Sequence, residues 1–264
     1  MTKSKTNKSL QTIILSGGKG TRMKEETEFR PKPMVEVGGF PLLWHIMRIY
    51  MYYGHKDFIL ALGYKGHMIK QYFMNWRMLV NDFSQSMSSG RVKFHTGKDN
   101  DFSVTHADTG IDTLTGGRIL KASKYLIGDE FMVTYGDGVS DIDVNKLLEF
   151  HHKQGTLGTV TGVHPQSRYG LVEVNSDTHL VSRFREKPVL TEFISGGFMV
   201  FKKEALKYFD DSEMENGLRR LAEANQLSLY PHEGFWKAVD TYNELEQLNK
   251  LWETNRPWAL WEKS

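Results

Sequence analysis

A glycine-rich run follows the first short apolar segment of the chain and has the composition of a phosphate-binding turn. It reads Ser16-Gly17-Gly18-Lys19-Gly20-Thr21-Arg22, and only a turn accommodates glycines at this density. Backbone N–H groups approach phosphate closely where such a turn lies beyond the carboxyl end of a strand. The dinucleotide fingerprint would need glycine where Met23 stands, and no P-loop Gly-Lys-Ser or Gly-Lys-Thr occurs. The dehydrogenase and P-loop classes are therefore disfavoured.

A lysine between two prolines comes next among the residues that could do chemistry. The segment Arg30-Pro31-Lys32-Pro33 should not form helix, because proline holds its neighbours extended, so Lys32 is expected to project from a stiff, strand-like piece. Together with Arg22, this lysine offers two cations for a polyphosphate. The alternative is a solvated lysine in a surface loop.

One aspartate occupies a position that suits a metal shared with phosphate, and a second lies just outside a predicted helix. Asp137 lies between two glycines directly after the apolar run Phe131–Tyr135, and Asp240 lies just before Thr241-Tyr242-Asn243-Glu244, which matches a helix capping box. A carboxylate at the end of a strand, with room for a bulky ligand, suits Mg²⁺ bound to substrate phosphates. The alternative for Asp137 is an ordinary Asx turn.

The elements that must position these residues alternate between strands and helices. Thr12–Leu15, Phe58–Leu62 and Phe131–Tyr135 have the length and composition of buried strands, and helical patterns cover Leu42–Tyr53 and Met68–Val80. This alternation predicts an α/β fold with a mainly parallel, doubly wound sheet.

The second half of the chain contains four further β-rich pieces, which we expect to be extra strands on the same sheet. The polar segment Asn81–Asp112 has weak periodicity and is expected to form a long loop or a protruding hairpin arm. The four β-rich pieces are Gly158–Val163, Gly170–Val174, Leu180–Arg185 and Gly196–Phe201.

Length and composition set broader limits. A chain of 264 residues with 39% hydrophobic residues predicts one domain over residues 1–264, with a C-terminal helix and tail over residues 241–262. With 34 Lys and Arg against 32 Asp and Glu, no charge excess attracts nucleic acid or an anionic membrane. The absence of cysteine excludes disulfides and thiol nucleophiles. The run Ile13–Leu15 is too short for a signal or membrane segment, so a cytoplasmic protein is expected.

The segment from Leu15 to Gly39 resembles the signature of the sugar-1-phosphate nucleotidyltransferases. Within that family, the likeness is greatest to the branch that joins CTP and glucose 1-phosphate. Further matching segments follow in order along the chain: Leu43-Trp44-His45-Ile46-Met47, Gly63-Tyr64-Lys65-Gly66, Asp108-Thr109-Gly110, Thr115-Gly116-Gly117-Arg118, Tyr135-Gly136-Asp137-Gly138, Glu186-Lys187-Pro188, Gly196-Gly197-Phe198 and Gly234-Phe235-Trp236.

The resemblance implies a Rossmann-like mixed sheet, mainly parallel and flanked by helices, and a reaction. A phosphate oxygen of the sugar 1-phosphate attacks the α-phosphorus of CTP and pyrophosphate leaves. In the family, the residues matching Asp137 and Asp240 hold Mg²⁺. The catalytic residues implied are Arg22 on the β- and γ-phosphates, Lys32 between the α-phosphate and the sugar phosphate, and Asp137.

The resemblance also assigns two sets of binding residues. Arg118 would read the base by donating to a pyrimidine O2. For Glu186 and Lys187, an ordinary exposed ion pair is the alternative. The nucleotide set comprises Leu15, Ser16, Gly17, Gly18, Gly20, Thr21, Thr113, Gly116 and Arg118. The sugar set comprises Gly170, Glu186, Lys187, Ser195 and Gly197.

Other interpretations remain open at this point. Ser195 stands where similar enzymes carry asparagine, so another phosphorylated sugar or polyol is an alternative to glucose 1-phosphate. Another nucleotide is an alternative to CTP, because the choice of base depends on detail that the sequence does not reveal. A regulatory relative that binds a nucleotide sugar without making one is a second alternative, although such a protein is expected to lose a catalytic charge. Similar enzymes assemble as homo-oligomers, so a hexamer or tetramer is expected here.

Overall fold

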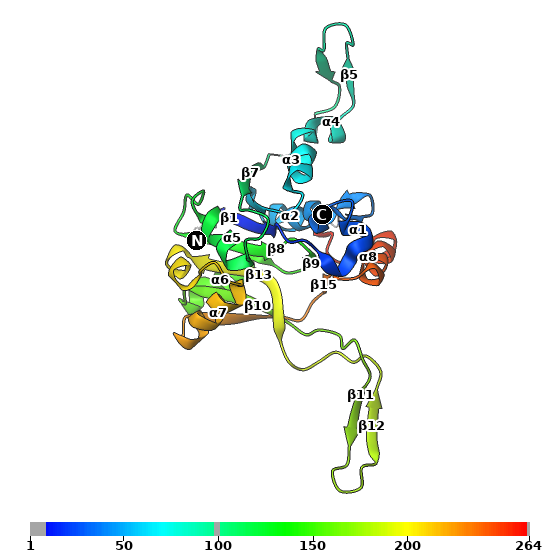
Figure 1. Ribbon diagram of the computed structural model, residues 1–264, viewed down its shortest axis with the longest axis vertical. Coiled ribbons are helices and arrows are strands. Elements are labelled where there is room, and N and C mark those ends of the chain that lie inside the picture. The colour runs from blue at the N-terminus through cyan, green and yellow to red at the C-terminus, as the bar shows by residue number, and fades with distance from the viewer. Residues whose placement is uncertain (1–8, 98–100, 263–264) are drawn as a thin grey trace, which may run out of the picture.

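A seven-stranded sheet forms the centre of the molecule (Figure 1). The computed structural model describes residues 9–97 and 101–262, apart from the side chains of residues 22, 24 and 25. The strands of this sheet are β1 (Gln11–Ser16), β4 (Asp57–Leu62), β7 (Ser103–Asp108), β8 (Glu130–Tyr135), β10 (Gly158–Val163), β13 (Ile194–Lys202) and β14 (Leu227–His232). Their order is β14-β10-β13-β8-β1-β4-β7. Only the contacts of β13 with β8 and β10 are antiparallel within this sheet, so the predicted mixed, mainly parallel sheet is confirmed.

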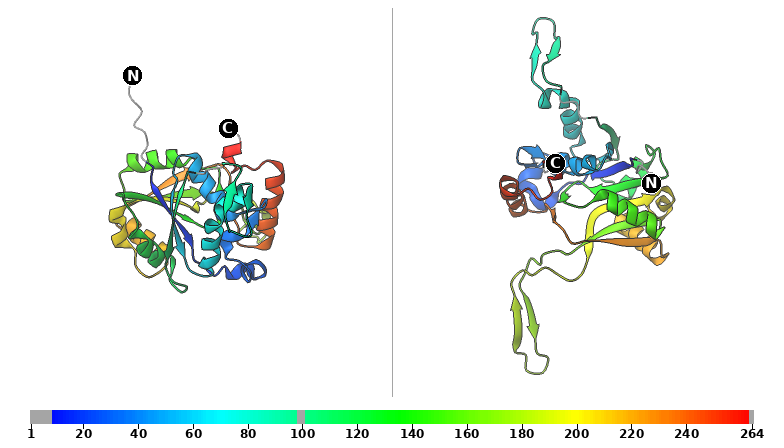
Figure 2. Two further views of the ribbon diagram at one scale, coloured as in Figure 1. Left: turned by 90° about the horizontal axis from the view of Figure 1, so that it is seen from above. Right: turned by 180° about the vertical axis from the view of Figure 1, so that it is seen from behind.

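Helices cover both faces of the sheet (Figure 2). They are α1 (Lys24–Thr27), α2 (Leu42–Tyr52), α3 (Gly66–Met74), α4 (Trp76–Val80), α5 (Thr115–Ser123), α6 (Val144–Gln154), α7 (Met214–Glu223) and α8 (Tyr242–Thr254). Successive strand residues such as Ile13 and Ile14 face opposite sides, and both are fully buried. One side packs against α2 and α6, and the other packs against α5 and α7. Burial on both faces explains the continuous apolar runs of these strands.

Two β-hairpins project from opposite sides of this body (Figure 1). The first arm, residues 76–97, carries β5 (Phe83–Gln85) and β6 (Val92–Phe94), and the second arm, residues 165–193, carries β11 (Leu171–Val174) and β12 (Val181–Arg185). Each arm is a two-stranded antiparallel sheet of its own.

Two expectations about these regions were wrong. β11 and β12 are not part of the central sheet, because the short turn between them folds the second strand back onto the first and satisfies their backbone groups locally. The loop or arm predicted over residues 81–112 is too long at its C-terminal end, because that range includes β7, which is the edge strand of the central sheet. In β7 only Ala107 is fully buried, and an edge strand with few buried side chains gives a weak sequence signal.

The expected extended conformation around Lys32 was also wrong. Residues Lys32–Met34 form a single 3₁₀ turn, and the chain is extended at the flanking residues, Pro31 with φ −67° and ψ 147° and Val35 with φ −67° and ψ 135°. Pro33 fits within the first turn because the N–H that proline lacks is not needed there. Lys32 therefore projects from a tight turn.

The helix boundaries agree more closely with the sequence. The helix expected over Leu42–Tyr53 is α2, and the capping box at Thr241 and Glu244 is present at the start of α8. The single helix expected over Met68–Val80 is broken at Asn75 into α3 and α4. Over the described ranges, none of the helices has the length and apolar character needed to cross a membrane.

The C-terminal tail is held on α2 by a buried histidine. His45 donates from Nε2 to the carbonyl of Val37 over 2.8 Å, and its Nδ1 accepts a 3.2 Å hydrogen bond from Nε1 of Trp258. Both rings are fully buried. A proton on Nδ1 would face the indole N–H, so the folded protein requires the neutral ring. Burial lowers the pKa of His45 to about 4, opposed by the hydrogen bond to Val37.

Acidification should therefore destabilise the fold through His45. Its pKa is about 4 in the folded protein and near 6.5 when unfolded, so the unfolded chain binds more protons between these values and the free energy of unfolding falls as pH drops through this window. At pH 5 the protonation of this residue alone should lower the free energy of unfolding by about 2 kcal/mol. Urea unfolding of His45→Gln should show a smaller loss between pH 7 and pH 5 than the wild type. Equal losses would contradict this account.

Candidate active site

Two parallel strands at the centre of the sheet end beside each other and carry the predicted phosphate-binding groups. β1 pairs with β8 on one side, with Leu15 opposite Tyr135, and with β4 on the other. The order of the strands therefore reverses at this point, and ligands of open α/β sheets bind outside such a switch point. The glycine turn follows β1, and Asp137 follows β8.

A hollow of about 450 Å³ opens here, and we call it the switch-point hollow. It contains most of the predicted nucleotide set, together with Lys32 and both aspartates. Ser16 is buried beneath it, and Gly116 is not among its lining residues. The lining residues are Leu15, Gly17, Gly18, Gly20, Thr21, Lys32, Pro33, Thr113, Leu114, Thr115, Arg118, Tyr135, Gly136, Asp137, Glu213 and Asp240.

A short strand pairing brings the two aspartates together. β9 (Gly138–Ser140) directly follows Asp137, and it pairs with β15 (Trp236–Ala238), which ends two residues before Asp240. The N–H of Val239 donates to the carbonyl of Asp137 over 2.9 Å. Residues far apart in the sequence are thereby fixed at one edge of the switch-point hollow.

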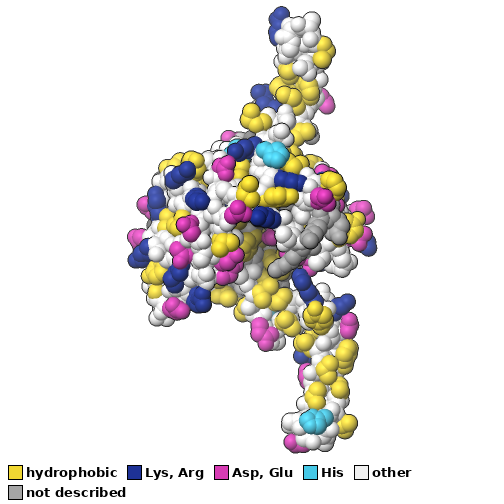
Figure 3. Space-filling view, in the orientation of Figure 1, with side chains coloured by type: hydrophobic (Ala, Val, Ile, Leu, Met, Phe, Trp, Pro, Cys, Tyr) yellow, Lys and Arg dark blue, Asp and Glu magenta, His cyan; other side chains and the backbone are white. Residues whose placement is uncertain are grey.

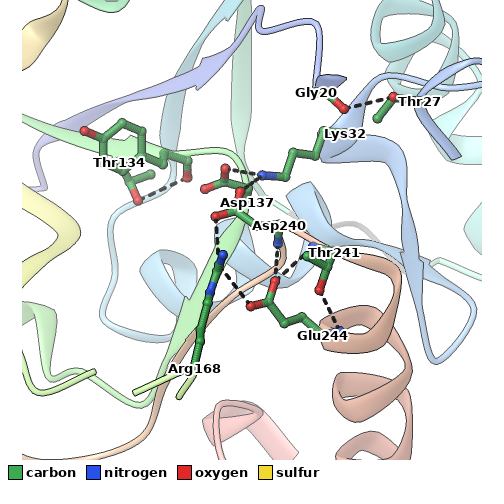
Figure 4. Close-up of polar contacts among 10 residues, drawn as sticks. Gly20, Thr27, Lys32, Thr134, Asp137, Arg168, Asp240, Thr241 and Glu244 are labelled. Atoms are coloured by element: carbon green, nitrogen blue, oxygen red, sulfur yellow. Dashed lines mark hydrogen bonds and ion pairs between the residues drawn. The ribbon is translucent and has the colours of Figure 1, made fainter. Parts of the chain in front are cut away.

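Lys32 lies between the two carboxylates (Figure 4). Its Nζ is 2.8 Å from Oδ2 of Asp137 and 2.8 Å from Oδ1 of Asp240. The lysine side chain is only 13% exposed. Burial on its own would lower the pKa of Lys32, but Asp137 and Asp240 outweigh it and raise this pKa above its ordinary value of 10.5. Lys32 is therefore held as an ammonium ion.

The start of α8 fixes the position of Asp240. Oε2 of Glu244 accepts hydrogen bonds from the N–H of Asp240 over 2.7 Å and from that of Thr241 over 2.9 Å. Arg168, at the root of the second arm, places Nη2 3.8 Å from Oδ2 of Asp240 and 3.4 Å from Oε1 of Glu244. Asp240 therefore lies between two cations, as Figure 4 shows.

Arg118 organises the glycine turn from beneath. The residue is only 3% exposed, and its guanidinium nitrogens donate to the turn and to the ends of two neighbouring strands. A side chain on Gly17 would lie 2.1 Å from Nη1 of Arg118, so only glycine fits there. Burial lowers the pKa of Arg118, opposed by Asp108 and Asp112. The acceptors are Oγ1 of Thr109 and the carbonyls of Gly17, Leu62, Gly110 and Ile111.

The predicted sugar set is divided by the structure. Ser195 lines a second hollow of about 380 Å³ that adjoins the first and shares Tyr135, Asp137 and Asp240 with it. Gly197, with φ of 83°, allows the Tyr135 ring to pack where a side chain would lie 2.6 Å away.

The rest of the sugar set is not brought to either hollow. Gly170, Glu186 and Lys187 belong to the second arm, and none of them is among the lining residues. The side chains of Glu186 and Lys187 are 65% and 57% exposed and lie 3.8 Å apart. Their role in sugar binding stays a prediction. The side chain of Arg22, in the turn η1 (Thr21–Met23), lies outside the described part of the chain.

Several residues of the site were not found from the sequence. Tyr135 donates from its hydroxyl to Oε1 of Glu215 over 2.6 Å, and both residues line the second hollow. Burial, reinforced by Glu215, raises the pKa of Tyr135. The position of Tyr135 at the end of β8 was a usable signal. Glu215 and Arg168 gave none, because they reach the site through the packing of α7 and the second arm.

The fold and the paired carboxylates define an α/β protein with its candidate site at the switch point, and comparison with known proteins gives its family. The family model described as nucleotidyl transferase matches residues 11–255. The chain therefore belongs to the nucleotidyl transferase family, which is a family of enzymes.

Two relatives match this chain along their whole length. The chain is 40% identical over 257 residues to the probable glucose-1-phosphate cytidylyltransferase of Bacillus subtilis. It is 39% identical over 259 residues to the glucose-1-phosphate cytidylyltransferase of Salmonella typhimurium. Each alignment covers 96% of this chain and 100% of the relative. A crystal structure of HddC from Yersinia pseudotuberculosis shares the fold, with a TM-score of 0.67 and 23% identity over 92% of this chain and 99% of that one.

Removing the Arg118 guanidinium should destabilise the protein, because buried carbonyls would lose their donor. Arg118→Met is expected to lower the free energy of unfolding by about 2–4 kcal/mol. Arg183→Met, on the exposed face of β12, is the matched control and should change it by less than about 0.5 kcal/mol. Urea unfolding measures both. A stable Arg118→Met variant would show that the glycine turn does not depend on this side chain.

Proposed function

We propose that the protein transfers the cytidylyl group of CTP to glucose 1-phosphate, giving CDP-glucose and pyrophosphate. The observation that carries this proposal is the ammonium of Lys32 between Asp137 and Asp240, in one hollow with the glycine turn. The two relatives named as glucose-1-phosphate cytidylyltransferases support the choice of base and sugar.

The substrates themselves supply the reacting groups. A phosphate oxygen of glucose 1-phosphate attacks the α-phosphorus of CTP, the new P–O bond forms, and the bond to the β-phosphate oxygen breaks to release pyrophosphate. No protein nucleophile is required, which agrees with a chain that has no cysteine. Catalysis then consists of positioning and of stabilising the charge on the transferring phosphoryl group.

The two aspartates fit a magnesium site that is completed by substrate. Among the described residues, no group of three or more His, Cys, Asp and Glu side chains could hold a metal ion. Mg²⁺ in phosphoryl-transfer sites takes one or two carboxylates and fills its other positions with phosphate oxygens and water. Asp137 and Asp240 would hold it, and when bound it would neutralise charge on the phosphate oxygens.

The residues of the chain divide the remaining work. Backbone N–H groups of Gly17, Gly18 and Gly20 receive the phosphates, while Lys32 donates to the α-phosphate and the sugar phosphate. Arg22 is assigned to the β- and γ-phosphates. Arg118 lines the same hollow and keeps its assignment to the base, and its bond to the carbonyl of Gly17 also holds the turn in shape.

The glucose moiety is assigned to the second hollow, where Ser195 lies beside both aspartates. Gly197 gives the ring of Tyr135 the space to form one wall of this hollow. Gly170, Glu186 and Lys187 keep their assignment to the sugar from the family resemblance alone, because they lie on the second arm and line neither hollow.

We also propose that the protein works in the cytoplasm as a homo-hexamer or homo-tetramer. Apolar side chains are exposed along both arms (Figure 3). In the first arm and its base, Met74 is 81% exposed and Met87 is 87% exposed, and Phe184 in the second arm is 62% exposed. Exposed apolar side chains in such numbers are typical of surfaces that contact other protein chains.

A matrix of substrates tests the reaction. Each of the four nucleoside triphosphates is incubated with Mg²⁺ and with glucose 1-phosphate, mannose 1-phosphate, galactose 1-phosphate or glycerol 3-phosphate, and pyrophosphate is measured. The CTP and glucose 1-phosphate pair should release it fastest. Faster release from any other pair would overturn the assigned base or sugar, and no release from any pair would favour a regulatory protein that only binds.

The assembly is tested by light scattering coupled to gel filtration. The chain mass is 30.4 kDa, so the expected particle contains four or six such masses. Met87→Glu together with Phe184→Glu introduces charge on the exposed apolar face of both arms and should shift the particle to smaller species. A monomeric wild type would refute the proposal.

A further inference from the structure

We propose that Lys32 is the resident counterion of the metal site, so that a divalent cation and the triphosphate displace it together. This inference rests on the proposed function, because the metal concerned is the one assigned to Asp137 and Asp240. It adds a second role for Lys32 in the free protein, before any substrate binds.

The geometry makes the ammonium and a metal alternatives. Lys32 Nζ lies 2.8 Å from Oδ2 of Asp137 and 2.8 Å from Oδ1 of Asp240. Mg²⁺ takes carboxylate oxygens as ligands at about 2.1 Å, so the two carboxylates that hold the ammonium are the ones that would hold the ion. The ammonium and the metal ion would compete for the same space between the carboxylates. Two positive charges this close together repel strongly where water is scarce.

Lys32 needs a new anion before it can leave. Its side chain is only 13% exposed, so water cannot fully solvate an ammonium that has lost both carboxylates. The glycine turn lines the same hollow, and a triphosphate bound there would offer phosphate oxygens to Lys32. The triphosphate therefore provides the partner that releases Lys32, while a metal bound to that triphosphate takes over the carboxylates.

Arg168 provides an internal comparison. Its Nη2 also approaches Asp240, but at 3.8 Å, and its other ion pair is with Glu244 instead of Asp137. The Arg168 side chain is 61% exposed, so solvent screens its charge. Arg168 should compete with a metal much less than Lys32 does.

Direct metal binding without nucleotide tests the exchange. Mn²⁺, as a paramagnetic substitute for Mg²⁺, is titrated into nucleotide-free wild type, Lys32→Met and Arg168→Gln, and free Mn²⁺ is measured by electron paramagnetic resonance. Lys32→Met should bind Mn²⁺ about tenfold or more tightly than the wild type, since one buried competing charge is gone. Arg168→Gln removes a charge from the same aspartate and should show a smaller gain.

A double variant locates the gain. Adding Asp137→Asn to Lys32→Met should return Mn²⁺ affinity to the wild-type level or below. Circular dichroism checks folding, and if Lys32→Met is unfolded, Lys32→Gln is judged by the same criteria. The proposal is overturned if the Lys32 variant binds Mn²⁺ no more tightly than the wild type, if Arg168→Gln gains as much, or if the double variant keeps the gain.

Turnover of the wild type is measured separately, so the two proposals can fail separately. No turnover from any substrate pair, combined with tighter Mn²⁺ binding by Lys32→Met, would refute the proposed function and support the exchange. Turnover of CTP with glucose 1-phosphate, combined with unchanged Mn²⁺ binding, would refute the exchange alone.

Discussion

The site depends on holding two aspartate carboxylates side by side in spite of their mutual repulsion. Backbone pairing of β9 with β15 fixes one against the other, and the capping of α8 orients the second. Lys32 offsets the repulsion with an ammonium that touches both. Because all three groups are partly or largely buried, each would be costly without the others, so the charge balance of the site is a structural requirement as well as a chemical one.

A buried guanidinium performs a comparable task for the glycine turn. The turn has few side chains of its own, so its shape must come from elsewhere, and Arg118 supplies it by donating to backbone carbonyls of three separate segments. Gly17, Gly18 and Gly20 of this turn line the switch-point hollow. Arg118, which was expected to read the base, is therefore bonded mainly to the backbone of the protein itself.

The sequence predicted the elements whose signals are local. Apolar runs identified β1, β4 and β8, and the spacing of Thr241 and Glu244 identified the start of α8. The position of Asp137 at a strand end, and its link with Asp240 through the family resemblance, also followed. Features set by tertiary pairing did not follow. The pairing of β9 with β15 brings the two aspartates together, but strands of three residues are too short to show a periodic pattern. Nothing local in the sequence therefore indicated that Lys32 would lie between Asp137 and Asp240.

The second arm was misplaced for a related reason. Alternating residues in β11 and β12 predict strands but not their partners, and a hairpin that pairs with itself has the same pattern as two strands of a larger sheet. As a result, three of the five residues assigned to the sugar belong to a projecting segment, while the nucleotide residues belong to the body.

Glu244 serves two purposes with a single carboxylate. It closes the first turn of α8, and it also fixes the main chain of Asp240 and meets Arg168. A change at this position would alter the end of a helix and the centre of the site in the same event. A substitution of Glu244 therefore cannot change the helix cap without also changing the position of Asp240, so both roles restrict which residue can stand there.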